Sequence, residues 1–235
     1  MEKWFVASKR ADFNKIGELF HISPVTARLM RNRDLTTVEE MQRYLYGSLS
    51  DLYDPHLLKD ADKGAEIIKE KIEAGKKIRI ISDYDVDGVS SNYILYQGLK
   101  RCGADVDYKI PDRVEDGYGI NEHLIEQAAE DGIDTIITCD NGIAASAQIA
   151  YGNSLGLTIV VTDHHDIPFQ KENDEITYLL PPAAAVINPK QKDCSYPFKS
   201  ICGAVVVYKF IQVLYDLFQI DQKESEAFLE IAAMA

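Results

Sequence analysis

The sequence lacks several features that would place it in a special class of proteins. No apolar run reaches the length of a membrane span, and the first five residues lack the form of a secretory signal. Only four cysteines occur, and no two of them form a CxxC pair. This excludes a disulfide framework or a thiolate zinc site as the basis of the fold. We therefore expect reduced cysteines in a cytoplasmic protein that does not enter a membrane.

An excess of basic residues is also missing. The net charge is −13, although residues 1–60 carry nine basic and nine acidic side chains and are neutral on balance. A basic surface is the usual electrostatic footprint of a protein that binds nucleic acid, whereas clustered carboxylates suit a hard divalent cation. A polyanionic substrate would therefore have to be received through bound metal and a local basic patch.

From residue 61 onward the sequence alternates short aliphatic runs with helical segments, whereas residues 1–60 look helical and irregular. Such alternation predicts βαβ units. We expect an α/β fold, with a mostly parallel five-stranded sheet and helices on both faces in residues 61–235, preceded by a short helical N-terminal segment. The expected strands are 78–82, 106–110, 135–139, 157–162 and 183–187, and the expected helices are 61–74, 90–101, 121–130, 143–150, 203–218 and a last one from 224. The polar stretch 170–175 is expected to be an exposed loop.

A first cluster of acidic residues, 83–88 (DYDVDG), directly follows the first predicted strand. In extended backbone, residues two apart share a face, so Asp83, Asp85 and Asp87 are expected to converge on one side. Three carboxylates so close together repel one another unless cations neutralise them. The alternatives are an acidic turn and a calcium-type loop. An EF-hand, however, needs a helix before its loop and a glutamate at the end, so divalent-metal binding is the preferred interpretation.

Two further polar clusters, 138–142 (TCDNG) and 163–165 (DHH), follow the third and fourth predicted strands. Asp140 is either a metal ligand or the cap of a helix, and Cys139 beside it is expected to be a core thiol. Two adjacent imidazoles behind a carboxylate are not easily explained by packing. Asp163 is predicted to be a ligand, and its alternative role is to orient a histidine through a hydrogen bond.

The three clusters are expected to meet, because ligand sites of open α/β sheets collect at the carboxyl ends of the strands. Together they supply carboxylates and imidazoles, and no thiolate is needed. Such a donor set suits Mn²⁺ or Mg²⁺ better than structural zinc. Two ions about 3.5–4 Å apart would activate water and stabilise the leaving oxygen of a phosphoester. Asp140 is the natural bridge between two such ions.

The clusters 83–88, 140–142 and 163–165 resemble motifs I, II and III of the DHH phosphoesterase superfamily. Within it the chain resembles the RecJ branch, which consists of single-strand-specific 5′→3′ DNA exonucleases. That closer resemblance extends over nearly all of the chain and includes 52–55 (LYDP), 110–113 (IPDR), 115–119 (EDGYG), 186–190 (VINPK) and 196–198 (YPF). It implies a DHH domain, two Mn²⁺ or Mg²⁺ ions, single-stranded DNA as substrate, and repair or replication proteins as partners.

The resemblance also implies a role for each residue of the motifs. One ion would be held by Asp85 and Asp140, with Asp83 nearby. The other would be held by Asp87, Asp140 and His164, and His165 would contact the scissile phosphate or orient the leaving group. The predicted catalytic residues are Asp140, His164 and His165, and the predicted metal ligands are Asp83, Asp85, Asp87, Asp140, Asp163 and His164.

A loop outside the motifs is implied to receive the nucleic acid through Arg113 and Tyr118. Each of these residues has a structural alternative. Arg113 could instead form a salt bridge with Glu115 or Asp116. Tyr118 could be a core aromatic residue, because base stacking and packing use the same face of the ring.

The superfamily's fourth motif would follow a helix like residues 228–235, where the sequence ends. An apolar helical end without a cap is typical of a cut chain. We therefore expect an N-terminal fragment with weak or no exonuclease activity of its own. Two other functions remain open, a phosphodiesterase for short oligonucleotides or cyclic dinucleotides and a non-catalytic replication scaffold. The RecJ-like loop argues against the first, and the presence of every predicted ligand argues against the second.

Overall fold

The structure is a computed structural model and describes residues 3–4, 9–114, 116–117, 119–173 and 175–235. The chain divides into two compact units, Met1–Leu52 and Tyr53–Ala235. Residues 53–60, expected with the N-terminal segment, lie with the second unit. The reason is a set of contacts to a distant loop, in which Ser195 Oγ donates a hydrogen bond to Leu57 O (3.0 Å) and Lys59 forms an ion pair with Asp193 (2.6 Å).

The N-terminal unit is helical, as expected. Its helices are α1 (Phe13–Phe20), α2 (Pro24–Asn32), α3 (Val38–Tyr46) and the short 3₁₀ helix η1 (Leu49–Asp51). Side chains that accept hydrogen bonds from the first turn begin α2 and α3, and Thr37 with Glu40 forms a capping box. A small apolar cluster around Phe20, Met30 and Met41 holds the three helices together.

The second unit is built on a five-stranded, fully parallel sheet in the order β2-β1-β3-β4-β7. This confirms the predicted α/β fold. The strands are β1 (Lys77–Ser82), β2 (Asp105–Lys109), β3 (Thr135–Cys139), β4 (Thr158–Thr162) and β7 (Ala185–Ile187). The three central strands carry aliphatic residues on both faces, as buried parallel strands do.

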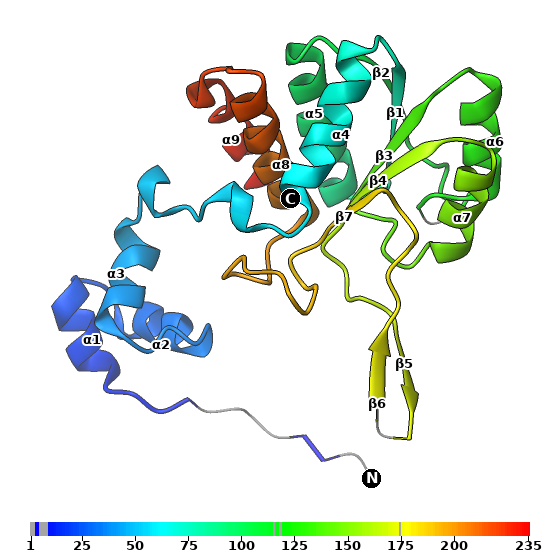
Figure 1. The fold of residues 1–235 in the computed structure, drawn as a ribbon. Coiled ribbons are helices and arrows are strands. Elements are labelled where there is room, and N and C mark those ends of the chain that lie inside the picture. Colours follow the sequence, from blue (N-terminus) through cyan, green and yellow to red (C-terminus); the bar gives the residue numbers. More distant parts are fainter. Residues whose placement is uncertain (1–2, 5–8, 115, 118, 174) are drawn as a thin grey trace. The chain divides into compact units, whose positions relative to one another are not determined.

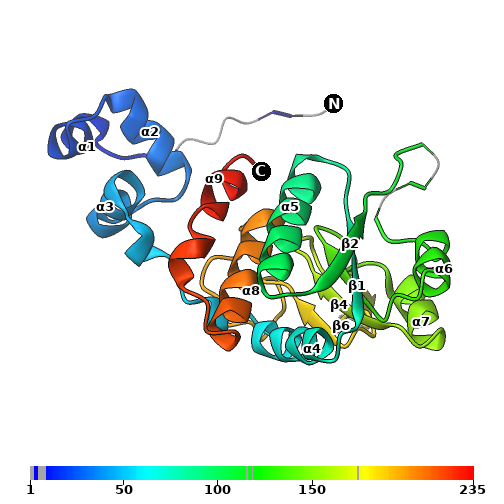
Figure 2. The ribbon, with the colours of Figure 1, turned by 90° about the horizontal axis from the view of Figure 1, so that it is seen from above.

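Helices cover both faces of this sheet (Figures 1 and 2). The helices α4 (Ala61–Glu73), α5 (Val86–Arg101) and α8 (Gly203–Leu217) share one apolar cluster, and α6 (Glu122–Glu130) and α7 (Ser146–Ser154) share the other. Neighbouring residues of β1 illustrate the two layers, since Ile80 belongs to the first cluster and Ile81 to the second. The 3₁₀ helices η2 (Pro55–Leu57) and η3 (Gln222–Ser225) and the short α9 (Phe228–Ala232) complete the unit. Within the part of the chain that the structure describes, none of the helices has the length and apolar character that crossing a membrane requires.

The expected loop at 170–175 is wrong, because most of this stretch forms an antiparallel hairpin. Strand β5 (Phe169–Glu172) pairs with β6 (Glu175–Tyr178), and Phe169 lies opposite Tyr178. The ring centroids of this pair are 6.3 Å apart in an edge-on arrangement, a cross-strand aromatic contact that stabilises a hairpin. Charged residues interrupt the aliphatic pattern here and hide the strand signal in the sequence.

Candidate metal centre

The three predicted clusters meet at one edge of the sheet. Strands β1, β3 and β4 are neighbours, and their last residues lie side by side in register. From β1 the chain adds β2 on one side of the sheet, and it then adds β3, β4 and β7 on the other side. Sheets with such a change of direction bind ligands between the two strands where it occurs, here β1 and β3. The backbone ladder extends one residue beyond each strand, through hydrogen bonds from Asp83 N to Cys139 O (3.4 Å), Asp140 N to Thr162 O (3.1 Å) and Asp163 N to Ile187 O (3.0 Å).

Asp140 occupies a backbone conformation that few residues other than glycine adopt. Its φ is 60°, in the left-handed region. The neighbouring Asn141 holds this turn, since its side-chain amide donates to Ile81 O and to Cys139 O, each at 3.0 Å. Asn141 was assigned no role from the sequence, although a polar residue directly after a strand-end aspartate is a usable signal of such a turn.

Cys139 lies behind this turn in the core, as the sequence predicts. It is completely buried, and burial raises the pKa of its thiol well above the ordinary value. The thiolate form is therefore strongly disfavoured. The donors of the site are carboxylates and imidazoles.

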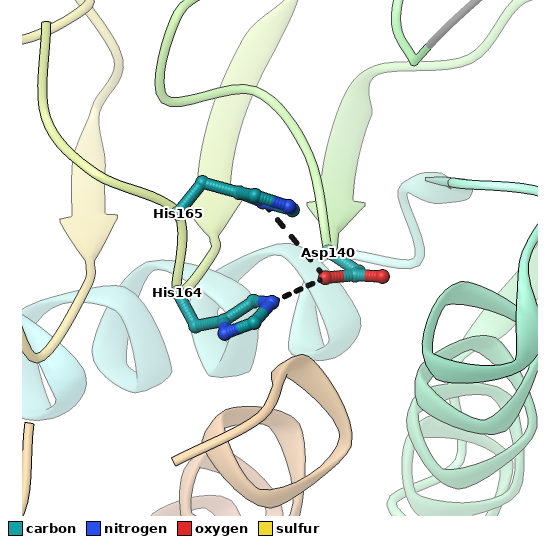
Figure 3. Close-up of side chains that lie close together, drawn as sticks. All are labelled: Asp140, His164 and His165. Atoms are coloured by element: carbon teal, nitrogen blue, oxygen red, sulfur yellow. Dashed lines mark ion pairs between the residues drawn. The ribbon is translucent and has the colours of Figure 1, made fainter. Parts of the chain in front are cut away.

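Two groups of donor atoms are close enough to hold an ion each. Asp83, Asp85 and Asp140 form one group, and Asp140, His164 and His165 form the other, with the donor atoms of each group within 4.8 Å of one another. Asp140 belongs to both. Both imidazoles point toward its carboxylate (Figure 3), with His164 Nε2 at 3.1 Å and His165 Nδ1 at 4.0 Å from Oδ1.

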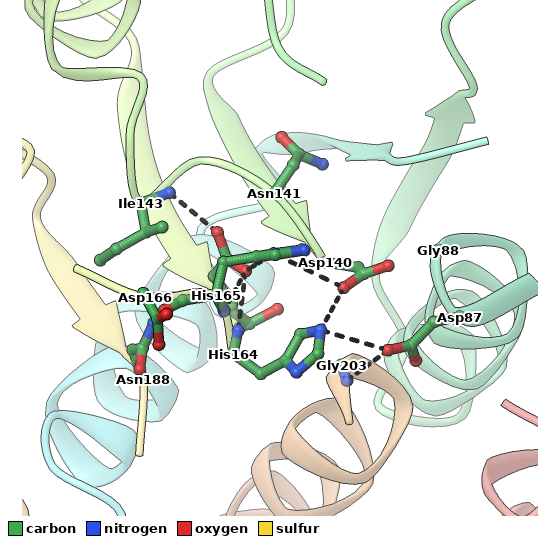
Figure 4. Close-up of polar contacts among 12 residues, drawn as sticks. Asp87, Gly88, Asp140, Asn141, Ile143, His164, His165, Asp166, Asn188 and Gly203 are labelled. Carbon is green, nitrogen blue, oxygen red and sulfur yellow. Dashed lines mark hydrogen bonds and ion pairs between the residues drawn. The ribbon is translucent and has the colours of Figure 1, made fainter. Parts of the chain in front are cut away.

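Asp87 lies beside the second group of donor atoms, but on a helix, which the sequence did not predict. Helix α5 begins at Val86, because Asp85 accepts a hydrogen bond from Gly88 N (2.9 Å) and caps it. The expected extended run with three aspartates on one face is therefore wrong. From the first turn of the helix, Asp87 Oδ2 lies 3.4 Å from His164 Nε2 (Figure 4).

The N-terminus of α8 supports Asp87 from the other side. Gly203 N donates a hydrogen bond of 2.7 Å to its carboxylate (Figure 4), and Ala204 N donates another of 2.7 Å. A Cβ at Gly203 would lie 2.7 Å from Asp140 Oδ1, so any larger residue would push into the donor group. Both the glycine and the helix terminus come from far along the chain, and no local pattern connects them to the metal motifs.

Asp163 has both carboxylate oxygens engaged within the protein. Oδ2 accepts from Ile143 N (2.9 Å), and Oδ1 accepts from the amides of His164 (2.7 Å) and His165 (3.1 Å). Oδ1 also lies 2.7 Å from His165 Nδ1. This geometry corresponds to the orienting role that the sequence left open for Asp163.

The electrostatics of the site follow from these contacts. The hydrogen bond to Asp163 raises the pKa of His165 to about 9, and the one to Asp140 raises the pKa of His164. Burial alone would raise the pKa of Asp163, but the hydrogen bonds from His165 and from backbone amides lower it below the ordinary value. Asp163 is therefore ionised at neutral pH and holds a positive charge on His165 in the metal-free protein.

The other buried carboxylates fit a site that takes up cations. Burial raises the pKa of Asp83, and it raises the pKa of Asp140 to about 6, with Asp87 and Asp85 adding repulsion. Asp83 Oδ1 is buried and has no hydrogen-bond partner among the described residues. A bound divalent cation would satisfy this oxygen and remove the repulsion, so the residues present fit Mn²⁺ or Mg²⁺.

Of the two residues implied to bind nucleic acid, the structure describes only Arg113. Tyr118 lies outside the described residues, as does Glu115, one of the two acids that could have paired with Arg113. The exposed Arg113 guanidinium lies over the ring of Tyr84, 5.2 Å from its centroid. Tyr84 sits next to Asp83, and no pattern in the sequence had pointed to a role for it.

Replacing Asp163 with asparagine is expected to lower the pKa of His165 from about 9 toward its ordinary value, by about one to two units. Asparagine keeps the shape of the side chain but loses the charge, and its amide would face backbone N–H groups. We also expect a loss of about 1–3 kcal/mol in the free energy of unfolding. NMR titration of the histidine rings measures the first effect, with the exposed His123 as internal control. An unchanged His165 titration would show that Asp163 does not hold the imidazolium.

The chain is similar to known proteins in sequence and in fold. The family model described as "DHH family, N-terminal domain" matches residues 77–235. The single-stranded-DNA-specific exonuclease RecJ of Bacillus subtilis (strain 168) is 37% identical over 209 residues, which cover 88% of this chain and 25% of that protein. The RecJ of Escherichia coli (strain K12) is 32% identical over 194 residues, 82% of this chain and 31% of the relative.

Solved structures show the same fold. An exonuclease RecJ bound to manganese is 30% identical, with a TM-score of 0.65 over 75% of this chain and 42% of that one. The RecJ of Thermus thermophilus in complex with Mn²⁺ is 24% identical, with a TM-score of 0.67 over 94% of this chain and 29% of that one. The chain thus spans only about a quarter to a third of the curated relatives named above. Because the family model matches most of the chain, we conclude that the chain belongs to the DHH family, with residues 77–235 as the N-terminal domain of that family.

Proposed function

We propose that this chain is the phosphodiesterase core of a RecJ-like exonuclease, which removes nucleotides from the 5′ end of single-stranded DNA with two Mn²⁺ or Mg²⁺ ions. The observation that carries this proposal is the position of Asp140, which belongs to both groups of donor atoms. One carboxylate between two cation sites is the arrangement that two-metal phosphoester hydrolysis needs. Similarity to the single-stranded-DNA-specific exonuclease RecJ supports the choice of substrate. Repair or replication proteins are proposed as partners.

The proposed ligands follow the two donor groups, except that Asp87 takes the place of His165 in the second group. Asp83, Asp85 and Asp140 would hold one ion, and Asp140, His164 and Asp87 the other. When bound, the ions supply Lewis acidity that lowers the pKa of a water molecule and neutralises charge developing on the phosphate.

His165 is placed to act on the phosphate itself. Its Nδ1 lies 2.7 Å from Asp163 Oδ1, and this contact orients the ring. With a pKa of about 9 in the metal-free protein, the ring carries a positive charge at neutral pH. This cation can pair with a phosphate oxygen or protonate the leaving oxygen.

The nucleic acid would be received beside the first donor group. Arg113, which lies over the Tyr84 ring, presents a cation next to Asp83. A guanidinium pairs with phosphate. Arg113 supplies the local basic group that an acidic chain requires to bind a polyanion. Tyr118 stays a proposed nucleic-acid-binding residue.

The test is the release of mononucleotides from a long 5′-phosphorylated single strand in the presence of Mn²⁺. We expect weak release by the 235-residue chain, no release from a duplex, and none by Asp140→Asn. A dinucleotide substrate tests the alternative of a short-oligonucleotide phosphodiesterase. Equal cleavage by the Asp140→Asn variant would refute the two-metal proposal, and a preference for the dinucleotide would refute the exonuclease assignment.

A further inference from the structure

A cavity of about 510 Å³ opens beside the metal centre. His165 and Asp163 form part of its wall, and so do Asp166 of the same loop, the turn after β3 (residues 141–145) and Gln148 of α7. Its volume lies in the range of pockets that bind small organic molecules. The cavity and the metal centre therefore share one residue, His165, that faces the reacting phosphate in the proposed function.

The lining of the cavity suits a neutral group better than a phosphate group. Among the described residues, neither lysine nor arginine lines it, and two of its wall residues, Asp163 and Asp166, are acidic. The rest is mostly small or aliphatic, with Ile120 and Ile143 as the largest apolar side chains. Asp163 pairs with His165, Asp166 pairs with Lys190, and the mostly apolar remainder of the wall accepts a neutral, flat group.

The position of the cavity defines what part of a nucleotide reaches it. In Figure 4, Ile143 lies on one side of His165 and Asp87 lies on the other. A molecule whose phosphate lies at the donor groups would thus extend past His165 into the cavity. In a nucleotide, the group beyond the phosphate and the sugar is the base.

We propose that this cavity binds the nucleobase of the nucleotide whose phosphate lies at the metal centre, an inference that rests on the proposed function. Apolar surface for the faces of the base comes from the exposed Ala144 and the half-buried Ala145, and the mostly buried Ile120 and Ile143 add little to it. The side chain of Gln148 forms no hydrogen bond with another described residue and lines the cavity, so its amide can pair with a base edge. A lining of backbone and small residues distinguishes bases poorly, which suits an enzyme that digests any sequence.

The test compares thymidine 5′-monophosphate with 2-deoxyribose 5-phosphate, which lacks the base, by calorimetry in the presence of Mn²⁺. We expect the wild-type chain to bind the nucleotide about tenfold more tightly, the gain typical of one buried or stacked base. Ala144→Leu narrows the cavity and should abolish this difference. Ala147→Leu is the matched control, because Ala147 is exposed on α7 and does not line the cavity.

Each result decides between the two proposals. Equal binding of both phosphates to a chain that binds Mn²⁺ overturns the base pocket and leaves the metal centre standing, as does an Ala144→Leu variant that keeps the preference. A wild-type chain that binds neither Mn²⁺ nor either phosphate overturns the proposed function, and the base pocket with it. If Ala144→Leu does not fold, saturation-transfer NMR on the wild type decides. The base protons must then receive more saturation than the sugar protons.

Discussion

Replacing Asp140 with asparagine is expected to remove most of the thermal stabilisation that Mn²⁺ gives to this chain. Asp140 belongs to both donor groups, so its loss weakens both sites at once. An ion present at about 100 times its dissociation constant stabilises a folded protein by about 2.7 kcal/mol. For a domain of this size that corresponds to a rise of about 5–10 °C in the melting temperature. The Asp140→Asn variant should show little of this rise in melting temperature.

In the metal-free protein the same substitution should act in the opposite direction. Burial raises the pKa of Asp140 to about 6, so ionisation costs folding free energy as the pH rises from about 4 to above 6. At neutral pH the cost is roughly 3 kcal/mol before the loss of the His164 contact is counted. Metal-free Asp140→Asn is therefore expected to be more stable than the wild type by about 1–3 kcal/mol at a pH of about 7.5.

Melting curves with EDTA and with Mn²⁺ measure both effects on the same samples. Asp166→Asn is the matched control, because Asp166 lies in the neighbouring loop and pairs with Lys190, outside both donor groups. It should keep the full Mn²⁺ shift. A full shift in Asp140→Asn would show that the shared carboxylate does not hold the metal. A less stable metal-free variant would show that Asp140 is a structural residue.

The sequence predicted the sheet and the meeting of the three motifs because both depend on local patterns. Aliphatic runs such as 78–82 specify buried strands, and the carboxyl ends of parallel strands gather at one edge in any order. The order of the strands itself, with β1 between β2 and β3, could not be read from the sequence. It depends on how the helices pack, and that is not a local property.

The detailed geometry of the site could not be predicted from the sequence either, because it also depends on contacts between residues that are far apart in the chain. The cap formed by Asp85 moves Asp87 onto a helix, and the amides that hold Asp87 come from Gly203 and Ala204, more than a hundred residues away in the chain. The role of Asp163 depends on Ile143 N, which belongs to a different loop. Periodicity and spacing indicate which residues share a site, but they do not show which oxygen accepts which hydrogen bond.

Lys209 is a buried basic residue that no sequence motif predicts. It lies in the middle of α8 and is 2% exposed, and its Nζ donates a hydrogen bond to Tyr53 O (2.7 Å). This bond holds the first residue of the sheet unit against α8. Burial lowers the pKa of Lys209 to about 8, and nearby Asp54 opposes this shift only in part.

The lowered pKa predicts a gain in stability at alkaline pH. Burial disfavours the charged form of Lys209 in the folded state. In the unfolded chain the side chain is solvated, and its pKa is about 10.4. The penalty is therefore complete below a pH of about 8 and disappears as the pH rises toward about 10.4. Over this range the wild type should gain roughly 3 kcal/mol in unfolding free energy relative to a Lys209→Met variant, since methionine does not titrate.

Urea unfolding of the wild type and Lys209→Met at pH 7 and pH 10 isolates this effect, because every other titrating group is common to both proteins. Lys63→Met serves as the control, since Lys63 is exposed on α4 and should follow the wild-type profile. Parallel profiles of the wild type and Lys209→Met would contradict the prediction. Parallel profiles would mean that water or a local rearrangement solvates the ammonium group of Lys209. Its contact with Tyr53 would then stabilise the fold without a cost for burying charge.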